Sequence, residues 1–365
     1  METCASIAAA LADFAPDMLS EDYDNTGLLI GSPLQRVSKV LLAYEITEEV
    51  VREAVHEGCQ LIITHHPLIF KSMKKLTEQS PEEKLIASLI RHNIGHIALH
   101  TNADNIPTGV NKALANQLGI QNFKILKPGK DKLYSLVVFI PDEAFDRVEA
   151  AIFDAGAGRI GNYSHCGYAL SGTGSFLPLE NASPAIGRIH QLERVSERRL
   201  EVIVPGRRLR TVLSAMLKAH PYEEVAHFIQ PLQNTDPESG SGGIGYLSKP
   251  MNYLEFVQMA KNALKANLIR ASNQHPDTVQ KVAFCGGAGA FLIPYAKEQG
   301  ADVFISGDIK YHDFFMADSS FGILDAGHCE TEWMILNEIA DYLNKKFHTF
   351  AVRISNVQTN PIKIL

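Results

Sequence analysis

The segment Leu61-Ile62-Ile63-Thr64-His65-His66-Pro67 gives the first indication of the fold. Its first four residues are apolar or β-branched, and such a short run is typical of a buried strand. The two histidines then stand at the carboxyl end of the strand, where open α/β sheets place their ligands. Because adjacent side chains of an extended segment point to opposite sides, His65 and His66 converge only if the backbone turns there. Otherwise they bind different ions, or they are the solvated or hydrogen-bonded histidines of a strand end.

Length and composition narrow the class of protein. A chain of 365 residues predicts two or three domains and an ample core. The net charge of −7 has no basic block in it, which argues against a nucleic-acid-binding role. Five scattered cysteines without a CxxC pair favour reduced thiols and a cytoplasmic protein. The first basic residue is Arg36, and no apolar run approaches about 20 residues, so we expect neither a targeting sequence nor a membrane span.

Strands and helices alternate through the first 129 residues. Lys39–Ile46 has the pattern of a buried strand, and Thr47 can cap the helix that follows it. Ser80-Pro81-Glu82-Glu83 has the pattern of a second helix start. The strand His96–His100 comes next and leads into Asp104, so this carboxylate also follows a strand end. The alternative for Asp104 is a cap of a helix or turn.

From about Lys132 the pattern changes to β-α-β-β-α-β, the order of a ferredoxin-like domain. Its flanks, Lys127–Lys130 and the Ser/Gly-rich Gln233–Gly245, have the composition of loops, and we expect the second to be mobile. The sequence therefore predicts a domain inserted at 130–245 between two halves of one α/β core, 1–129 and 246–365. Its elements are expected near Leu136–Pro141, Glu143–Phe153, Tyr163–Leu170, Leu200–Val204, Arg207–Ala219 and Val225–Gln230.

Two segments of this predicted domain have open interpretations. The glycine-rich Gly156–Tyr163 resembles a phosphate-binding loop, but no GK[ST] follows it, and turn geometry is favoured. His220-Pro221-Tyr222-Glu223-Glu224 lies between a helix and a strand. It could line a subunit contact or a small-ligand site, or be a helix stop with a buried tyrosine.

Beyond the predicted insert the α/β pattern resumes, and its last strand, Gly322–Asp325, leads into a helix predicted from Gly327 to Leu343. On that helix His328 and Glu332 are four residues apart, so they share one face with their Cβ atoms about 6 Å apart. Such a pair can hold one divalent cation or two. The alternative is an ordinary polar pair on a solvated helix face.

Residues that bind metals or move protons thus recur at the ends of short apolar strands. Imidazole and carboxylate ligands suit zinc, iron or manganese and need no thiolate. Three histidines and two carboxylates can serve two ions if one carboxylate bridges them, and ions about 3.5–4 Å apart are the arrangement of two-metal hydrolases. The residues in this set are His65, His66, Asp104, Asp308, His312, His328 and Glu332.

Five segments carry the core motifs: Tyr23-Asp24-Asn25-Thr26-Gly27-Leu28, Thr64-His65-His66-Pro67-Leu68-Ile69-Phe70, His100-Thr101-Asn102-Ala103-Asp104, Gly307-Asp308-Ile309-Lys310-Tyr311-His312-Asp313, and Gly327-His328 with Glu332. Through these motifs the chain resembles the Nif-three-like dinuclear-metal proteins, also called GTP cyclohydrolase type 2 homologues. The resemblance covers nearly the whole chain. The predicted insert resembles the PII/CutA-like domain of longer bacterial members, through Gly161-Asn162-Tyr163 and His220–Glu224.

The resemblance implies ligands for two divalent metal ions and a toroidal homohexamer, with the metal sites facing the interior and the inserts near the openings. Glu332 would be the bridging ligand. One position departs from the family pattern, because Glu45 stands where an aspartate is usual after the first strand. The implied metal ligands are His65, His66, Asp104, His328 and Glu332.

Two functions follow from these residues and the resemblance. The first is a metal-dependent hydrolase of GTP cyclohydrolase type that acts on a nucleotide or related heterocycle. In it His312 or Lys310 would protonate a leaving group or hold an anionic substrate, unless both have only a structural loop role. The alternative is a non-catalytic, metal-loaded hexamer that binds a metabolite or a protein, with the insert as its sensor domain.

Overall fold

The computed structural model describes residues 2–364. The chain forms two compact units. One contains the residues up to Gly129 together with those from Pro237 onward, and the other is the segment Lys130–Asp236. In the described residues, no helix combines the length and apolar character needed to cross a bilayer.

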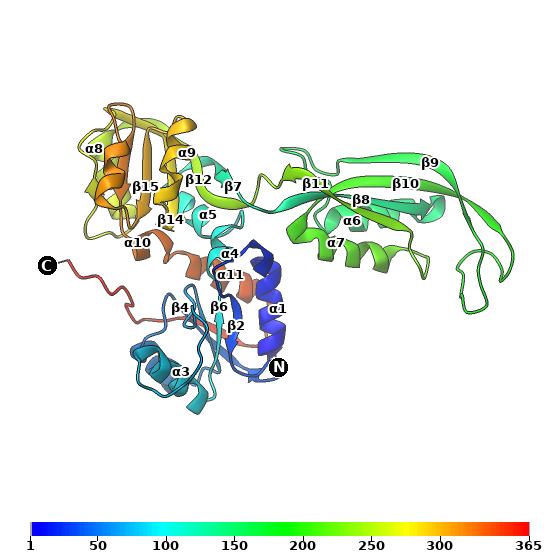
Figure 1. Ribbon diagram of the computed structural model, residues 1–365, viewed down its shortest axis with the longest axis horizontal. Helices are drawn as coiled ribbons and strands as arrows, with labels where there is room; N and C mark the ends of the chain where they lie inside the picture. Colours follow the sequence, from blue (N-terminus) through cyan, green and yellow to red (C-terminus); the bar gives the residue numbers. More distant parts are fainter. Residues whose placement is uncertain (1, 365) are drawn as a thin grey trace. The chain divides into compact units, whose positions relative to one another are not determined.

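The first sheet of the larger unit has five strands in the order β17-β4-β5-β6-β2 (Figure 1). Only β2 is antiparallel to its neighbour. Leu61 and Ile63 of β5 pack with α1 and α11, whereas Ile62 packs with α2 and α3. The strand is therefore covered on both faces, which explains its continuous apolar sequence. The elements are β2 (Gly27–Ile30), β4 (Lys39–Ala43), β5 (Leu61–Thr64), β6 (Gly95–Ala98), β17 (Ala351–Ile354), α1 (Cys4–Phe14), α2 (Glu48–Glu57), α3 (Pro81–Arg91) and α11 (Ile335–Lys346).

The second sheet of this unit has six strands in the order β13-β16-β15-β14-β12-β7. β14, β15 and β16 are parallel, and the other pairings are antiparallel. Helices α5 and α8 share one apolar cluster with this sheet, and α9 shares another. The elements are β7 (Gln121–Pro128), β12 (Gly240–Asn252), β13 (Arg270–Ala271), β14 (Thr278–Ala288), β15 (Val303–Gly307), β16 (Gly322–Asp325), α4 (Thr101–Asp104), α5 (Val110–Gln117), α8 (Tyr253–Ala263), α9 (Ile293–Glu298) and α10 (His328–Glu332).

Local sequence signals set several helix ends. The Thr47 side chain accepts a hydrogen bond from the Val50 amide, and Ser80 caps α3 in the same way with Pro81 in the first turn, as predicted. The prediction of a single helix from Gly327 to Leu343 is wrong, because the helix is interrupted between α10 and α11. The short elements that remain are β1 (Glu2–Thr3), β3 (Arg36–Val37), η1 (Asp17–Leu19), η2 (Asp142–Ala144), η3 (Ala290–Leu292) and η4 (Tyr311–Met316).

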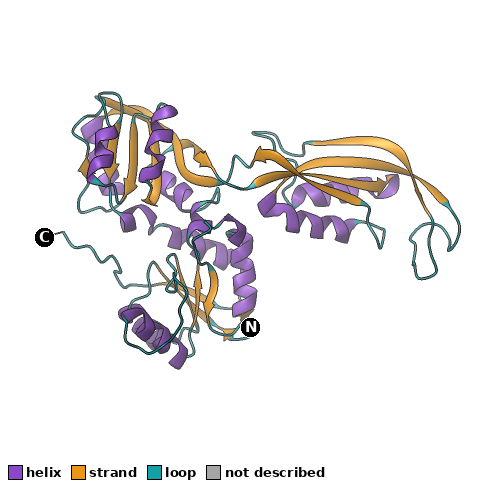
Figure 2. Ribbon diagram, viewed as in Figure 1, coloured by secondary structure: helices purple, strands orange, loops and turns teal. Residues whose placement is uncertain are grey.

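The unit Lys130–Asp236 has the element order β8-α6-β9-β10-α7-β11. Its antiparallel sheet has the strand order β11-β8-β10-β9, and Figure 2 shows both helices on one side of the strands. Leu136 and Val138 of the sheet and Val148 and Met216 of the helices belong to one buried cluster. The elements are β8 (Lys132–Pro141), α6 (Phe145–Asp154), β9 (Gly167–Phe176), β10 (Glu193–Pro205), α7 (Gly206–Ala219) and β11 (His227–Thr235).

The far boundary of this unit differs from the sequence prediction. The unit ends at Asp236, not at 245, because Gly240–Asn252 forms the strand β12 of the six-stranded sheet. The glycines that predicted a mobile loop allow close approach instead, since a Cβ on Gly243 would collide with the Phe284 ring. Gly240 pairs with Pro128 in β7, so the two chain segments that flank the unit are neighbours in one sheet.

Candidate metal centre

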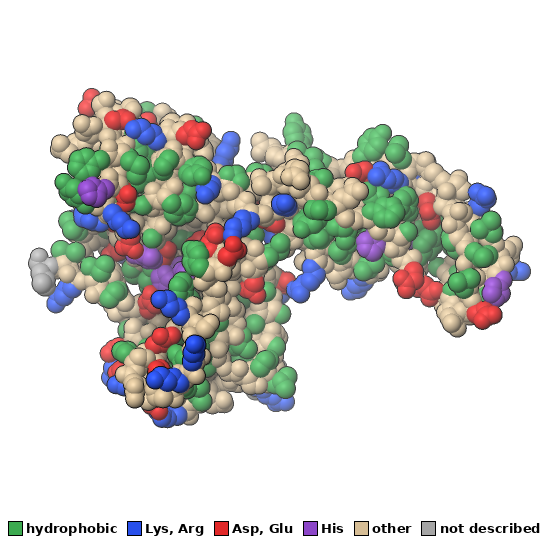
Figure 3. Space-filling model, viewed as in Figure 1, with side chains coloured by type: hydrophobic (Ala, Val, Ile, Leu, Met, Phe, Trp, Pro, Cys, Tyr) green, Lys and Arg blue, Asp and Glu red, His purple; other side chains and the backbone are tan. Residues whose placement is uncertain are grey.

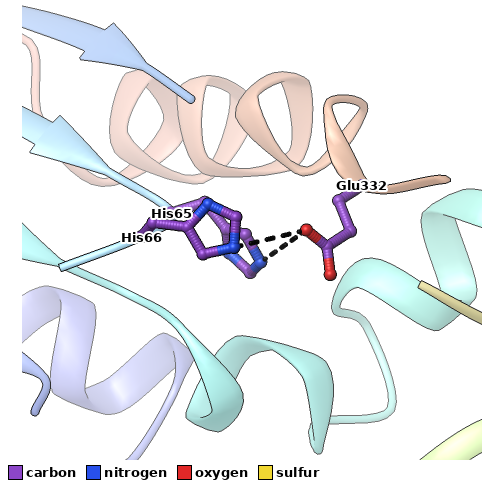
Figure 4. Close-up of side chains that lie close together, drawn as sticks. All are labelled: His65, His66 and Glu332. Atoms are coloured by element: carbon purple, nitrogen blue, oxygen red, sulfur yellow. Dashed lines mark ion pairs between the residues drawn. The ribbon is translucent and has the colours of Figure 1, made fainter. Parts of the chain in front are cut away.

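The chain turns after β5, and both histidines face the same carboxylate. His65 is fully buried and its Nδ1–H donates to the Leu99 carbonyl oxygen at 2.8 Å, so Nε2 is left facing Glu332. His65 Nε2 and His66 Nε2 lie 3.5 and 3.6 Å from Glu332 Oε2 (Figure 4). These three residues offer ligand atoms within 4.8 Å of one another and could hold a metal ion.

Glu332 reaches this point from α10 and is 3% exposed. Its Oε2 accepts a hydrogen bond from the Tyr44 hydroxyl at 2.7 Å and lies 3.2 Å from His328 Nε2, four residues earlier on the helix. Although burial alone would raise the pKa of Glu332, the neighbouring His65 and His328 hold it well below its usual value. The carboxylate is therefore ionised and available as a ligand.

His328 is oriented by a carboxylate from another strand end. Asp308 follows β15, and its Oδ2 lies 2.7 Å from His328 Nδ1. Burial opposes a charge on His328, but Glu332 and Asp308 together raise its pKa to about 10. Asp308 on Nδ1 holds the ring with Nε2 towards Glu332, and a metal ion bound at Nε2 would displace the proton that this nitrogen carries in the metal-free site.

Asp104 lies in α4, next to His65. Its Oδ1 is 3.7 Å from His65 Nε2. Burial raises the pKa of Asp104 to about 7. Three buried atoms of this group, His65 Nε2, His66 Nδ1 and Asp104 Oδ1, have no hydrogen-bond partner in the described part of the chain.

Glu45, the position that departs from the family pattern, lies beside His66. Its Oε1 is 2.7 Å from His66 Nδ1, a contact without the alignment of a hydrogen bond. The longer side chain therefore still reaches the histidine.

A cavity of about 370 Å³ lies against the centre. Figure 3 shows histidine side chains gathered in a recess of the larger unit, with acidic side chains beside them. Asp104, His328 and Glu332 line the cavity together with Lys127 and the aromatic side chains of Tyr23 and Phe291. A small molecule in the cavity would therefore touch the candidate metal ligands.

The sequence did not single out a histidine–carboxylate pair whose histidine lines the cavity. His100 Nδ1 lies 2.7 Å from Asp24 Oδ1, and the Asp24 side chain is fully buried. Burial opposes its ionisation, but hydrogen bonds from His100 and Thr101 lower the pKa of Asp24 to about 2. Both residues lie in the motifs that carried the resemblance, so their side-chain chemistry was the available signal.

The predicted catalytic residues lie outside the wall of this cavity. Lys310 and His312 are exposed, and neither lines the cavity. His312 belongs to η4, where its ring packs with Tyr311 and Phe315. Of this loop, Asp308 is the residue that contacts His328.

Comparison with known proteins identifies the family. The family model Duf34/NIF3 (NGG1p interacting factor 3) matches residues 2–361. A Bacillus subtilis protein named GTP cyclohydrolase 1 type 2 homolog is 37% identical over 359 residues, which is 96% of each chain. The crystal structure of a Bacillus cereus protein related to NIF3 has a TM-score of 0.86 at 36% identity and covers 100% of this chain and 99% of its own. A Staphylococcus aureus crystal structure has a TM-score of 0.73 at 27% identity, with 100% and 99% covered. The chain therefore belongs to the Duf34/NIF3 family, as its motifs predicted.

Proposed function

We propose that the centre binds two divalent metal ions and that the loaded protein is a hydrolase. The observation that carries this proposal is the convergence of His65 Nε2 and Asp104 Oδ1 beside Glu332, because both atoms are buried and have no hydrogen-bond partner among the described residues, whereas buried polar groups normally find one. The proposed ligands are those that the resemblance implies, with Glu332 as the bridge: His65, His66, Asp104, His328 and Glu332.

The distances fit a metal better than a hydrogen-bond network. Two nitrogen or oxygen ligands of a tetrahedral zinc ion, each about 2.0–2.2 Å from it, lie about 3.3–3.6 Å apart. Glu332 Oε2 lies 3.5 Å from His65 and 3.6 Å from His66, and His65 lies 3.7 Å from Asp104. These separations are too long for good hydrogen bonds. The donor set of imidazoles and carboxylates suits zinc, iron or manganese.

The neighbouring residues would orient the ligands and move protons. A two-metal site supplies a water of lowered pKa and polarises the bond under attack. Tyr44 and Asp308 hold Glu332 and His328 in place. His100 lines the cavity with its Nδ1 held by Asp24, which leaves Nε2 to accept or donate a proton. The leaving-group role of Lys310 or His312 stays a prediction.

The substrate that we propose is a nucleotide or a related heterocycle. The Bacillus subtilis relative is named as a GTP cyclohydrolase 1 type 2 homolog. Tyr23 and Phe291 in the cavity wall offer faces for a heterocycle, and the Lys127 ammonium, 5.6 Å from the Phe291 ring centre, offers a charge for an anionic group.

For the assembly we propose the toroidal homohexamer of the resemblance, and for the segment Lys130–Asp236 a ferredoxin-like, PII/CutA-like domain. The strand order β11-β8-β10-β9 and two helices on one face support the ferredoxin-like assignment. Light scattering after gel filtration tests the hexamer, and a monomer or dimer mass would contradict it.

Metal analysis of the purified protein tests the centre. After dialysis against zinc, iron(II) or manganese, we expect two ions per chain in the wild type and a large loss in Glu332→Gln. Glu330→Gln is the matched control on the same helix, because Glu330 bonds to Asn360 outside the proposed ligand set. Fewer than one ion per chain in the wild type, or equal loss in both variants, would contradict the proposal.

A hydrolysis screen of the metal-loaded protein over nucleotides and cyclic amides tests the activity. We expect His100→Gln to keep its metal but to lose about 10²-fold or more in turnover, the usual contribution of a general acid or base. If the loaded wild type hydrolyses none of these compounds, the non-catalytic metal-loaded binder replaces the hydrolase.

A further inference from the structure

A second cavity, of about 380 Å³, lies within the unit Lys130–Asp236. Its wall includes the aromatic side chains of Phe139, Phe176 and Tyr222, and otherwise mostly aliphatic residues and proline. Phe176 and Tyr222 meet edge to face, with 5.8 Å between ring centres. Pockets of this size and apolar character are typical of small-molecule sites.

Glu197 of β10 places a buried carboxylate in this apolar wall. The residue is 8% exposed, and its Oε1 accepts a hydrogen bond from the Tyr222 hydroxyl at 3.1 Å. Its Oε2 has no partner among the described residues. A Cβ on Gly174 of β9 would collide with Oε2, so the glycine provides the room for the carboxylate. A carboxylate accepts about four hydrogen bonds, and most of that capacity is unused here.

The segment after α7 fixes Tyr222 at the cavity. His220 is buried, its Nε2–H donates to the Phe139 carbonyl oxygen at 3.0 Å, and its Nδ1 accepts from the Tyr222 amide at 3.2 Å. Burial and the neighbouring Glu197 raise the pKa of Tyr222, so its hydroxyl remains a donor. Of the sequence interpretations of His220–Glu224, this geometry favours the small-ligand site.

The charge of the cavity wall has one sign. Glu197, Glu223 and Glu224 line it, and the described lining residues include no lysine, arginine or histidine. Glu223 Oε1 accepts from the Ser183 amide at 2.7 Å, and no ion pair joins Glu223 to a basic side chain in the described part of the chain. A ligand with apolar surface and a positive charge therefore complements this cavity, because a carboxylate in an apolar wall is stabilised by a cation.

We propose that this cavity binds a small apolar ammonium compound, with the ammonium group on Glu197 Oε2 and the hydrocarbon part among Phe139, Phe176 and Tyr222. Aromatic faces stabilise such cations in addition to the carboxylate. The site is independent of the metal centre and gives the inserted unit a ligand class of its own.

Ligand-observed NMR on the full-length protein tests the proposal with 2-phenylethylammonium as the probe and 2-phenylethanol as its neutral counterpart. We expect saturable binding of the ammonium at millimolar concentration and weaker binding of the alcohol. Because hydrogen bonds to charged groups are strong, Glu197→Gln is expected to weaken the ammonium about tenfold or more. It should leave the alcohol unchanged.

Glu201→Gln is the matched control, since Glu201 lies on the same strand but bonds to Ser135 and Arg199 outside the cavity. Gly174→Ala is a second test, because its Cβ displaces the Glu197 carboxylate without removing a charge, and it should weaken the ammonium as well. The absence of saturable ammonium binding, equal binding of the alcohol, or an equal effect of Glu201→Gln would overturn the proposal.

Discussion

The substitution Tyr44→Phe removes one hydroxyl from the candidate metal centre and leaves the ring in place. Tyr44 follows β4, is 6% exposed, and donates to Glu332 Oε2 at 2.7 Å. Burial and the adjacent Glu332 raise the pKa of Tyr44, so the hydroxyl is the donor in this hydrogen bond. The variant therefore tests a single hydrogen bond to the proposed bridging ligand.

Two independent arguments give the same magnitude for the loss of metal-binding free energy in Tyr44→Phe. A hydrogen bond to a buried charged group stabilises by about 1.5–3 kcal/mol. Loss of a group that orients a metal ligand typically weakens metal affinity about 10–100-fold. That range corresponds to about 1.4–2.8 kcal/mol. We therefore expect Tyr44→Phe to bind its metal about 10–100-fold more weakly than the wild type.

Competition with a chromophoric chelator measures this affinity. The matched control is Tyr342→Phe. The hydroxyl of Tyr342 in α11 donates to the carbonyl oxygen of Ala10 in α1 at 2.8 Å, outside the proposed ligand set. It should lower the free energy of unfolding by about 1 kcal/mol and leave metal affinity unchanged. Wild-type metal affinity in Tyr44→Phe, or equal weakening in the control, would refute the reasoning.

Three further changes probe the centre and its surroundings. Gly287 has φ +61°, and a Cβ added there would collide with Glu332 Oε1. Gly287→Ala should therefore weaken metal binding and lower the free energy of unfolding by about 1–2 kcal/mol. Gly300→Ala is the control, because Gly300 has φ +68° but open space around it, so denaturant unfolding should show a loss of stability without a loss of metal affinity. The pKa of Asp24 in the folded protein is about 2, below its ordinary 3.8, so the ionised carboxylate stabilises the fold by about 2 kcal/mol above about pH 4. This stabilisation is lost as the pH falls towards 2. The free energy of unfolding of Asp24→Asn, measured against pH, should lack this loss. Replacement of residues 130–238 by an Asn-Gly turn should leave metal content unchanged, because the Gly129 amide already donates to the Ser239 carbonyl oxygen at the junction, and loss of metal from a folded product would contradict this.

The sequence was informative where a local pattern has one physical cause. The four apolar or β-branched residues before His65 form a strand because β5 is covered on both faces, and the strand ends at Thr64, directly before the histidines. His328 and Glu332 face each other because four residues make about one helical turn. Even with the helix broken after Glu332, that single turn was enough to bring the two side chains together.

Partners from distant parts of the chain were beyond local patterns. Tyr44 and Glu332 are 288 residues apart, and Asp24 and His100 are 76 apart, so only the assembled sheets bring them into contact. Gly240–Gly245 misled the prediction for a related reason. Glycine is needed there because Phe284 of a neighbouring strand leaves no room for a side chain at Gly243, and local composition does not reveal this contact.

The candidate metal centre joins the two sheets of the larger unit, since His65 and His66 follow β5 of one sheet and Glu332 follows β16 of the other. Ions bound there would add their binding free energy to the packing of these sheets. That packing has an apolar basis of its own, because Val110 of α5 belongs to one buried cluster with Leu61 of β5, while Leu114 of the same helix packs with the six-stranded sheet. Chelation should therefore loosen the ligands and lower the melting temperature while the fold remains, in contrast to small zinc domains, whose few apolar contacts cannot hold them together without metal.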